Sequence, residues 1–161
     1  MDYYKDIFPE RPYLDDMKVE DLAACDLPAY IIDTRALERN MQILASVQNL
    51  SGCKILLALK SFSTFSTFPI IKKYLHGCCA SSPWEARLAR EEFGKEVHSY
   101  APAFSEFDFK EICELSDHVV FNSFQQMTRY KADLDKLGIE YGLRVNPEHS
   151  ETEVELYNPC S

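Results

Sequence analysis

The run KILLALK (54–60) is the stretch from which the fold of this chain can be read. Residues 55–59 are all apolar, and Lys60 follows them directly. A continuous apolar run of this length is typical of a strand that is covered on both faces, as strands of parallel sheets are. A lysine at the end of such a strand is costly if it stays charged and unpaired. The run therefore raises two questions: which sheet holds the strand, and what Lys60 does there.

Similar runs recur along the chain, with amphipathic helical stretches between them. Further strands are expected at 28–33 (PAYIID), 78–82, 96–101, 118–122 and 141–146. Helices are expected at 35–50, 66–76, 83–93, 105–116 and 123–137. Thr34 is a candidate cap for the first of these helices, and Gly52 a candidate stop. Strands that alternate with helices predict an α/β fold with a parallel sheet, because parallel neighbours need crossover connections.

Two architectures fit this pattern, a doubly wound open sheet and a (β/α)8 TIM barrel. The sequence contains no GxGxxG and no GxxxxGK[ST] motif, so a Rossmann nucleotide site or a P-loop has no support. Polar residues stand at the expected strand ends: Lys60, Ser81, Ser82, Tyr100, Asn122, Ser123, Arg144 and Asn146. Such a set favours a barrel, where function gathers at the carboxyl ends of the strands. The strands are too few to close one, so we expect the N-terminal portion of an incomplete barrel, with an arm at 1–26 and a partial barrel domain at 27–161.

Composition narrows the function classes. The chain has 161 residues, a net charge of −9 and a pI of about 4.9, which argues against nucleic acid and anionic membranes as partners. No signal peptide and no apolar stretch of membrane-spanning length is apparent, so a cytoplasmic protein is expected. The six cysteines form no CxxC pair and the four histidines no HxH or HExxH pattern, so we expect free thiols and no metal site.

Lys60 has three readings on position alone. Its stem could lie on apolar surface with the ammonium group in water. It could instead contact a phosphate. It could also react as a neutral amine with an aldehyde, because desolvation at the end of a buried strand favours the neutral nucleophile.

Several longer stretches carry a family resemblance. They are ALKSFSTFSTFP (58–69), CCASSPWEARLAREEFGKEVHSYAPAFSE (78–106), DHVVFNSFQQM (117–127) and GLRVNPEHSE (142–151). In this order they resemble the pyridoxal-phosphate (PLP) enzymes of the alanine racemase and ornithine decarboxylase fold type, called fold type III. The similarity is greatest to the carboxynorspermidine (carboxyspermidine) decarboxylase family and runs over about 27–161.

The resemblance implies a role for particular residues. Lys60 matches the catalytic lysine that holds PLP covalently, and Arg144 matches an arginine near the cofactor ring. Further cofactor contacts are implied at Ser82, Glu85 and Asn122, and a weaker substrate contact at His149. Plainer roles stay open: a salt bridge for Arg144, a favourable first-turn helix charge for Glu85, and a solvated loop position for His149. Cys79 stands near where related enzymes carry an acidic residue, which leaves one cofactor contact in doubt.

The implied function is PLP-dependent decarboxylation of carboxynorspermidine or carboxyspermidine to norspermidine or spermidine, by a homodimer when the protein is complete. Family members also carry a ring-stacking histidine, a glycine-rich phosphate loop and a β domain, which follow later in their chains. We therefore expect this chain to be inactive by itself. The alternatives are another fold type III decarboxylase, acting on diaminopimelate, ornithine or arginine, and a non-catalytic PLP-binding protein.

Overall fold

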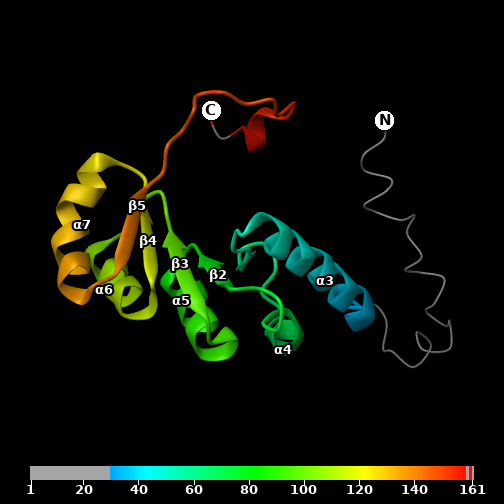
Figure 1. The fold of residues 1–161 in the computed structure, drawn as a ribbon. Coiled ribbons are helices and arrows are strands. Elements are labelled where there is room, and N and C mark those ends of the chain that lie inside the picture. Colours follow the sequence, from blue (N-terminus) through cyan, green and yellow to red (C-terminus); the bar gives the residue numbers. More distant parts are fainter. Residues whose placement is uncertain (1–29, 159, 161) are drawn as a thin grey trace.

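The computed structural model describes residues 30–158 and residue 160, and the arm expected at 1–26 lies outside this part of the chain. The described residues form a five-stranded parallel sheet (Figure 1). Its strands are β1 (Leu56–Ala58), β2 (Gly77–Ala80), β3 (Glu96–Tyr100), β4 (His118–Phe121) and β5 (Glu140–Leu143). The parallel strand–helix alternation predicted from the sequence is therefore confirmed.

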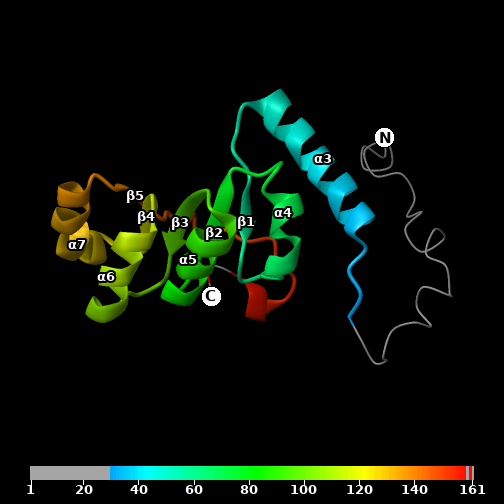
Figure 2. The same cartoon turned by 90° about the horizontal axis from the view of Figure 1, so that it is seen from below.

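The order of the strands decides between the two architectures. The sheet runs β1-β2-β3-β4-β5, so each strand pairs with the next one along the chain. A doubly wound sheet reverses its strand order at a switch point, whereas a barrel adds strands in one direction. Helices α4 to α7 follow one another along the same side of the row of strands (Figure 2). The arrangement is that of five consecutive strands of a (β/α)8 barrel.

The helices fall close to the predicted stretches. They are α3 (Thr34–Ser51), α4 (Phe68–Ile71), α5 (Pro83–Leu88), α6 (Glu106–Leu115) and α7 (Phe124–Leu137). The 3₁₀ turns η1 (Phe65–Thr67) and η3 (Glu155–Tyr157) and the π-helical turn η2 (Ala89–Phe93), which continues α5, complete the set. Among the described residues, none of the helices combines the length and the apolar character needed to cross a membrane.

The hydrophobic core lies between the sheet and the helices. Phe121, Val97 and Val119 have no exposed surface on the helix side of the sheet. The helices and the turns that adjoin them contribute the equally buried Phe68, Phe93, Ile112 and Leu134. In β3 and β4 buried residues alternate with half-buried ones. Within the described residues, the helix side of these two strands is therefore covered more fully than the opposite face.

Two local expectations at the start of the described chain were wrong. Residues 30–33 form no strand, and Tyr30, Ile31 and Ile32 are exposed there; an extended segment becomes a strand only where a partner strand meets it. Asp33, rather than Thr34, caps α3, because its Oδ1 accepts the N–H groups of Arg35 (2.9 Å) and Ala36 (3.2 Å). These backbone hydrogen bonds also lower the pKa of the Asp33 carboxyl.

The helix expected at 66–76 is shorter than its apolar spacing suggested. Of the aromatic residues Phe62, Phe65 and Phe68, which recur at every third position, only Phe68 is fully buried, and Phe65 is exposed. The α-helical part ends at Ile71, where the chain turns to bring β2 beside β1. Helical spacing in this segment therefore overestimated the length of the helix.

Buried polar groups fix the position of α3 against the sheet. The Gln48 side chain is almost fully buried and donates from Nε2 to the Tyr74 carbonyl (2.8 Å). Its Oε1 accepts the Ile55 N–H (2.8 Å) and lies 2.7 Å from His76 Nδ1. One side chain thus joins α3 to the segments that lead into β1 and β2. It thereby helps to fix the position of β1, the strand that precedes Lys60.

Candidate functional site at the carboxyl ends of the strands

The strand register brings the predicted site residues to one edge of the sheet. Ala58 pairs with Cys79, and Leu59 N–H donates to the Cys79 carbonyl (3.1 Å). Lys60 and Ser81 each lie two residues beyond this pair, at the same end of the two strands. At the other side, Arg144 N–H donates to the Phe121 carbonyl (2.8 Å) and so lies beside Asn122. Because all strands are parallel, their carboxyl ends share this edge.

Lys60 lies in the turn directly after β1. The N–H groups of Ser61 and Phe62 both donate to the Ala58 carbonyl and close this turn (3.0 and 3.1 Å). Lys60 itself is exposed, so within the described part of the chain the desolvation expected for it is absent. Its Nζ has no hydrogen-bond or ion-pair partner among the described residues, which leaves the amine available to a ligand.

The segment after β2 is held by hydrogen bonds around the N-cap of α5. Ser82 is the N-cap of α5, and its Oγ accepts the Glu85 N–H (3.2 Å). The Glu85 carboxylate reaches back, and its Oε2 accepts from both the N–H (2.7 Å) and the hydroxyl (2.8 Å) of Ser81. Two of the predicted cofactor contacts, Ser82 and Glu85, are therefore joined in one small network that fixes Ser81 at the carboxyl end of β2.

The segment after β4 has the same arrangement of hydrogen bonds around an N-cap. Ser123 caps α7, and its Oγ accepts the Gln126 N–H (3.1 Å). The Gln126 side chain in turn accepts the backbone N–H of Asn122 through Oε1 (2.7 Å). The sequence analysis missed Gln126, although the spacing Ser-x-x-Gln is a signal for this type of cap. At both strand ends the residue before the cap is thus held by the third residue of the helix.

Asn122 also joins two other predicted residues through its side chain. Tyr100 Oη donates to Asn122 Oδ1 (2.9 Å), and Arg144 Nη1 donates to the same oxygen (3.2 Å). These residues come from the ends of β3, β4 and β5, so three neighbouring strands meet at one carboxamide. Arg144 is exposed and forms no ion pair among the described residues, so both its cofactor role and its salt-bridge interpretation stay predictions.

His149 lies apart from this group. It belongs to the exposed segment after β5, and its Nε2 is 3.6 Å from a carboxylate oxygen of the equally exposed Glu151. No hydrogen bond joins it to the other candidate residues within the described chain. The structure thus places His149 in a solvated loop, and a substrate contact by it stays a prediction.

A layer of ionisable side chains lies on the same face of the sheet, further from the carboxyl edge. His98 and His118 are register partners and stack with ring centroids 4.0 Å apart. His98 Nε2 is 3.2 Å from Glu96 Oε2, and His118 Nδ1 is 3.1 Å from Glu140 Oε2. Each imidazole thus has a carboxylate of its own, in an arrangement that the sequence spacing did not reveal.

Glu96 is the most perturbed group of this layer. Lys54 Nζ donates to its Oε1 (2.5 Å), and this hydrogen bond, with that from His98, lowers the pKa of Glu96 to about 2. Ligand atoms of Glu96, His98 and His118 lie within 4.8 Å of one another, which is close enough for a metal ion. Because Lys54 already pairs with Glu96 and the rings are stacked, we interpret the layer as a network of polar contacts.

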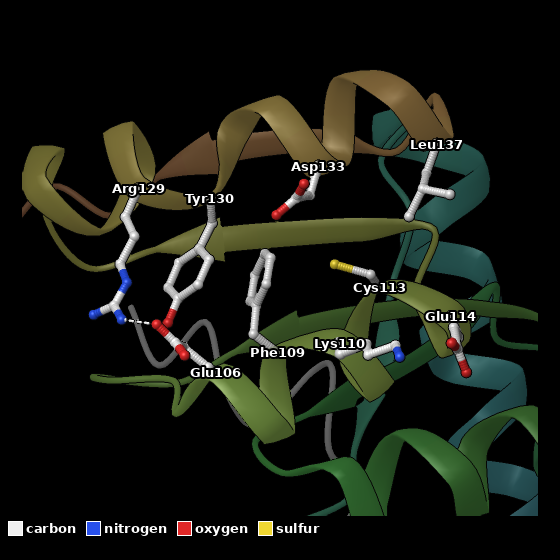
Figure 3. A pocket seen from close by; sticks show the side chains of 9 residues that line it. All are labelled: Glu106, Phe109, Lys110, Cys113, Glu114, Arg129, Tyr130, Asp133 and Leu137. Carbon is white, nitrogen blue, oxygen red and sulfur yellow. Dashed lines mark hydrogen bonds and ion pairs between the residues drawn. The ribbon is translucent and has the colours of Figure 1, made fainter.

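A cavity of about 620 Å³ lies on the helix side of the sheet, away from the strand ends. Figure 3 shows it between α6 and α7, with Arg129 turned toward Glu106 at one end and Leu137 at the other. Its inner wall is the stacked pair of Phe109 and Tyr130, whose ring centroids are 4.0 Å apart. Both rings are buried, so the cavity is a groove between packed helices.

Comparison with known proteins gives this geometry a context. No protein-family model matches the chain. This chain is 42% identical over 139 residues to the carboxyaminopropylagmatine decarboxylase of Synechocystis sp., and the alignment covers 86% of this chain and 36% of that protein. It is 46% identical over 133 residues to the carboxynorspermidine/carboxyspermidine decarboxylase of Campylobacter jejuni, which covers 83% of this chain and 34% of that protein. The chain thus spans about a third of the length of these relatives.

Solved structures share the fold. The crystal structure of the Campylobacter jejuni carboxynorspermidine decarboxylase with norspermidine superimposes with a TM-score of 0.74 at 42% identity, over 81% of this chain and 35% of that one. Diaminopimelate decarboxylase from Helicobacter pylori, with L-lysine, gives a TM-score of 0.66 at 20% identity, over 81% and 35%. D-threonine aldolase from Filomicrobium marinum gives a TM-score of 0.65 at 19% identity, over 83% of this chain and 38% of that one. This chain has the fold of the fold type III PLP enzymes.

Both the resemblance seen in the motifs and the predicted barrel fold are thereby confirmed. In a fold type III barrel the carboxyl ends of the strands surround the ligand site. The edge that carries Lys60, Asn122 and Arg144 is therefore the candidate site of this chain, whereas the helix groove of Figure 3 lies on its outer side.

Proposed function

We propose that this chain forms the Lys60 side of the active site of a PLP-dependent decarboxylase that converts carboxynorspermidine or carboxyspermidine to norspermidine or spermidine. The observation that carries the proposal is the unpartnered amine of Lys60 at the end of β1, in a chain with the fold of the Campylobacter jejuni enzyme. In this proposal residues 27–161 are part of a barrel domain that other segments complete.

The residues present fit PLP by their chemistry. Lys60 offers an amine for the aldehyde of the cofactor, and Arg144 offers a planar cation for its phenolic oxygen or for an anionic neighbour. The Nδ2 of Asn122 has no partner among the described residues and can donate a hydrogen bond. When bound, PLP would supply an electron sink for the electron pair that remains after CO2 leaves.

The other predicted cofactor residues have supporting roles in this proposal. Glu85 and Ser82 fix the start of α5, and with it the position of Ser81 at the carboxyl end of β2. Lys60 Nζ would hold the cofactor between turnovers, and as a neutral amine it could accept a proton once the substrate amine has replaced it. His149 is a candidate contact for the substrate, since it is exposed in the loop that follows Arg144.

A second substrate has support from one observation. The Synechocystis relative, at 42% identity, is a carboxyaminopropylagmatine decarboxylase, so its substrate would end in a guanidinium group where carboxyspermidine ends in an amine. We propose a carboxylated polyamine as the substrate class. Steady-state kcat/KM values for carboxynorspermidine, carboxyspermidine and carboxyaminopropylagmatine would identify the preferred substrate. Turnover of diaminopimelate in preference to all three would refute the proposed substrate class.

The test of the proposed function uses the complete protein that carries this chain. Borohydride reduction in the presence of PLP should add the cofactor mass to the peptide that contains Lys60, and Lys60→Ala should abolish both this label and the visible absorbance of the bound cofactor. Lys136→Ala is the matched control, because Lys136 lies on α7 and pairs with Asp133 (3.5 Å). Labelling of Lys60→Ala at the wild-type level would refute the assignment, and PLP binding without release of CO2 would indicate a non-catalytic PLP-binding protein.

We also propose that the complete enzyme acts as a homodimer, as the resemblance implies. Analytical ultracentrifugation of the complete protein would test this, and a monomer with full activity would contradict it.

A further inference from the structure

Three side chains from three neighbouring strands meet at one oxygen atom. Asn122 Oδ1 accepts from Tyr100 Oη at 2.9 Å and from Arg144 Nη1 at 3.2 Å. We propose that Tyr100 is a positioning residue that acts through Asn122 to hold the Arg144 guanidinium at the carboxyl edge of the sheet. The inference rests on the proposed function in one respect, namely that Arg144 serves a ligand bound at this edge.

Arg144 needs such support because its own surroundings hold it weakly. It follows the last residue of β5, its side chain is exposed, and an arginine side chain has many rotamers in solvent. The hydrogen bond to Asn122 Oδ1 selects among these rotamers. A guanidinium has only donors, so it binds the carboxamide only where the oxygen, and not the NH₂ group, faces it.

Tyr100 is the more rigid side chain of the three, and its hydroxyl fixes the position of the Asn122 carboxamide. It is the last residue of β3, and its half-buried ring projects from the inner face of the sheet. A tyrosine side chain has two χ angles, so its hydroxyl is placed with little freedom. The bond from this hydroxyl fixes where the carboxamide lies, and Gln126 fixes the Asn122 backbone from the other side (2.7 Å).

The position of the Arg144 guanidinium affects the binding of any anion that it contacts. The planar fork of the guanidinium recognises carboxylate or phosphate oxygens by direction as well as by charge. A displacement of about 1 Å at such a group is enough to weaken binding or catalysis strongly. Tyr100 would thus influence the affinity for a ligand that it does not itself touch.

The experiment is a double-mutant cycle in the complete protein. Tyr100→Phe and Asn122→Ala, separately and together, are compared for the dissociation constant of PLP from the cofactor-free protein. Each single variant should weaken binding by about threefold to tenfold, as expected for one hydrogen bond. The double variant should bind no more weakly than Asn122→Ala alone, because Tyr100 acts only through Asn122. Additive losses would overturn the proposal.

A matched control separates the role of Tyr100 from a general effect of removing a hydroxyl. Tyr141→Phe makes the same chemical change one strand away from Asn122, on the helix side of the sheet, where the Tyr141 hydroxyl donates to Asp135 Oδ1 (3.0 Å). Its PLP affinity should stay at the wild-type value. Equal losses in Tyr100→Phe and Tyr141→Phe would also overturn the proposal.

A second readout does not depend on the cofactor. In crystal structures of the cofactor-free variants, Arg144 should leave its place or lose order in Tyr100→Phe but not in Tyr141→Phe. Asn122→Asp, which keeps an acceptor oxygen, should retain the Arg144 position. An unmoved Arg144 in Tyr100→Phe refutes the positioning role. If the wild-type protein binds no PLP, the proposed function fails, while the position of Arg144 still decides this inference.

Discussion

Gly77, the first residue of β2, has no room for a side chain. It pairs with Leu56 on one side and Glu96 on the other, and a Cβ atom at this position would lie 2.1 Å from the Glu96 carbonyl oxygen. Contacts of Cβ atoms below 3.0 Å are essentially never observed. Gly77→Ala therefore forces a separation of at least 3.0 − 2.1 = 0.9 Å between β2 and β3. Both contacting groups are backbone, so the expected cost is at the upper end of overpacking, about 3 kcal/mol.

The assay compares unfolding of the complete protein with that of a matched variant, Gly52→Ala. Gly52 ends α3 with φ of 73°, and a Cβ there meets nothing within 4 Å, so only the left-handed backbone is penalised, by about 1 kcal/mol. Gly77→Ala should show the lower midpoint in urea and in thermal unfolding. It should also weaken PLP binding, because β2 pairs with β1, the strand that leads to Lys60. A loss of stability no greater than that of Gly52→Ala would refute the steric argument.

Three further results are expected from the complete protein. Phe121→Ala, at a position with no exposed surface, should cost about 3–5 kcal/mol in a urea titration, and a loss below 1 kcal/mol would show a core that collapses freely. Glu96 has its pKa lowered to about 2 by Lys54, so its stabilisation is present above pH 4.5 and is lost as the pH falls toward 2; Glu96→Gln should lower the urea midpoint at pH 6 by an amount worth about 0.5–1 kcal/mol and leave it unchanged near pH 2, and a constant difference would contradict this. Burial raises the pKa of Cys78 to about 12, so an alkylating reagent should modify the exposed Cys53 first, and faster labelling of Cys78 would contradict the fold.

Much of the fold could be predicted because it depends on local patterns. The run that ends at Lys60, and the caps Ser82 and Ser123, each carry their signal within a few residues. Residues 30–33, the described part of the strand expected at 28–33, form no strand for the opposite reason. Its apolar residues suit a strand, but pairing depends on a partner that the run itself does not encode.

The sequence indicated which residues stand at the carboxyl ends of the strands, but not which of them contact one another. The sequence placed Lys60, Asn122 and Arg144 at strand ends, but the register alone decides that the last two share a hydrogen bond. The stacked rings of His98 and His118 lie 20 positions apart in the chain and meet for the same reason. Contacts across strands are invisible to spacing rules, which describe one element at a time.

The sequential strand order has a consequence for how such a barrel is synthesised. Each strand binds the one translated just before it, so a growing sheet can form on the ribosome from contacts that are short in sequence. In a complete (β/α)8 barrel, the outer edge of the first strand is paired only after the last strand has been made. During that interval the inner face is open to water, and its charged residues, Glu96 and Glu140 with their histidine partners, make it a poor surface for aggregation. The polar contacts inside the sheet would thus protect an unfinished barrel as well as fill a finished one.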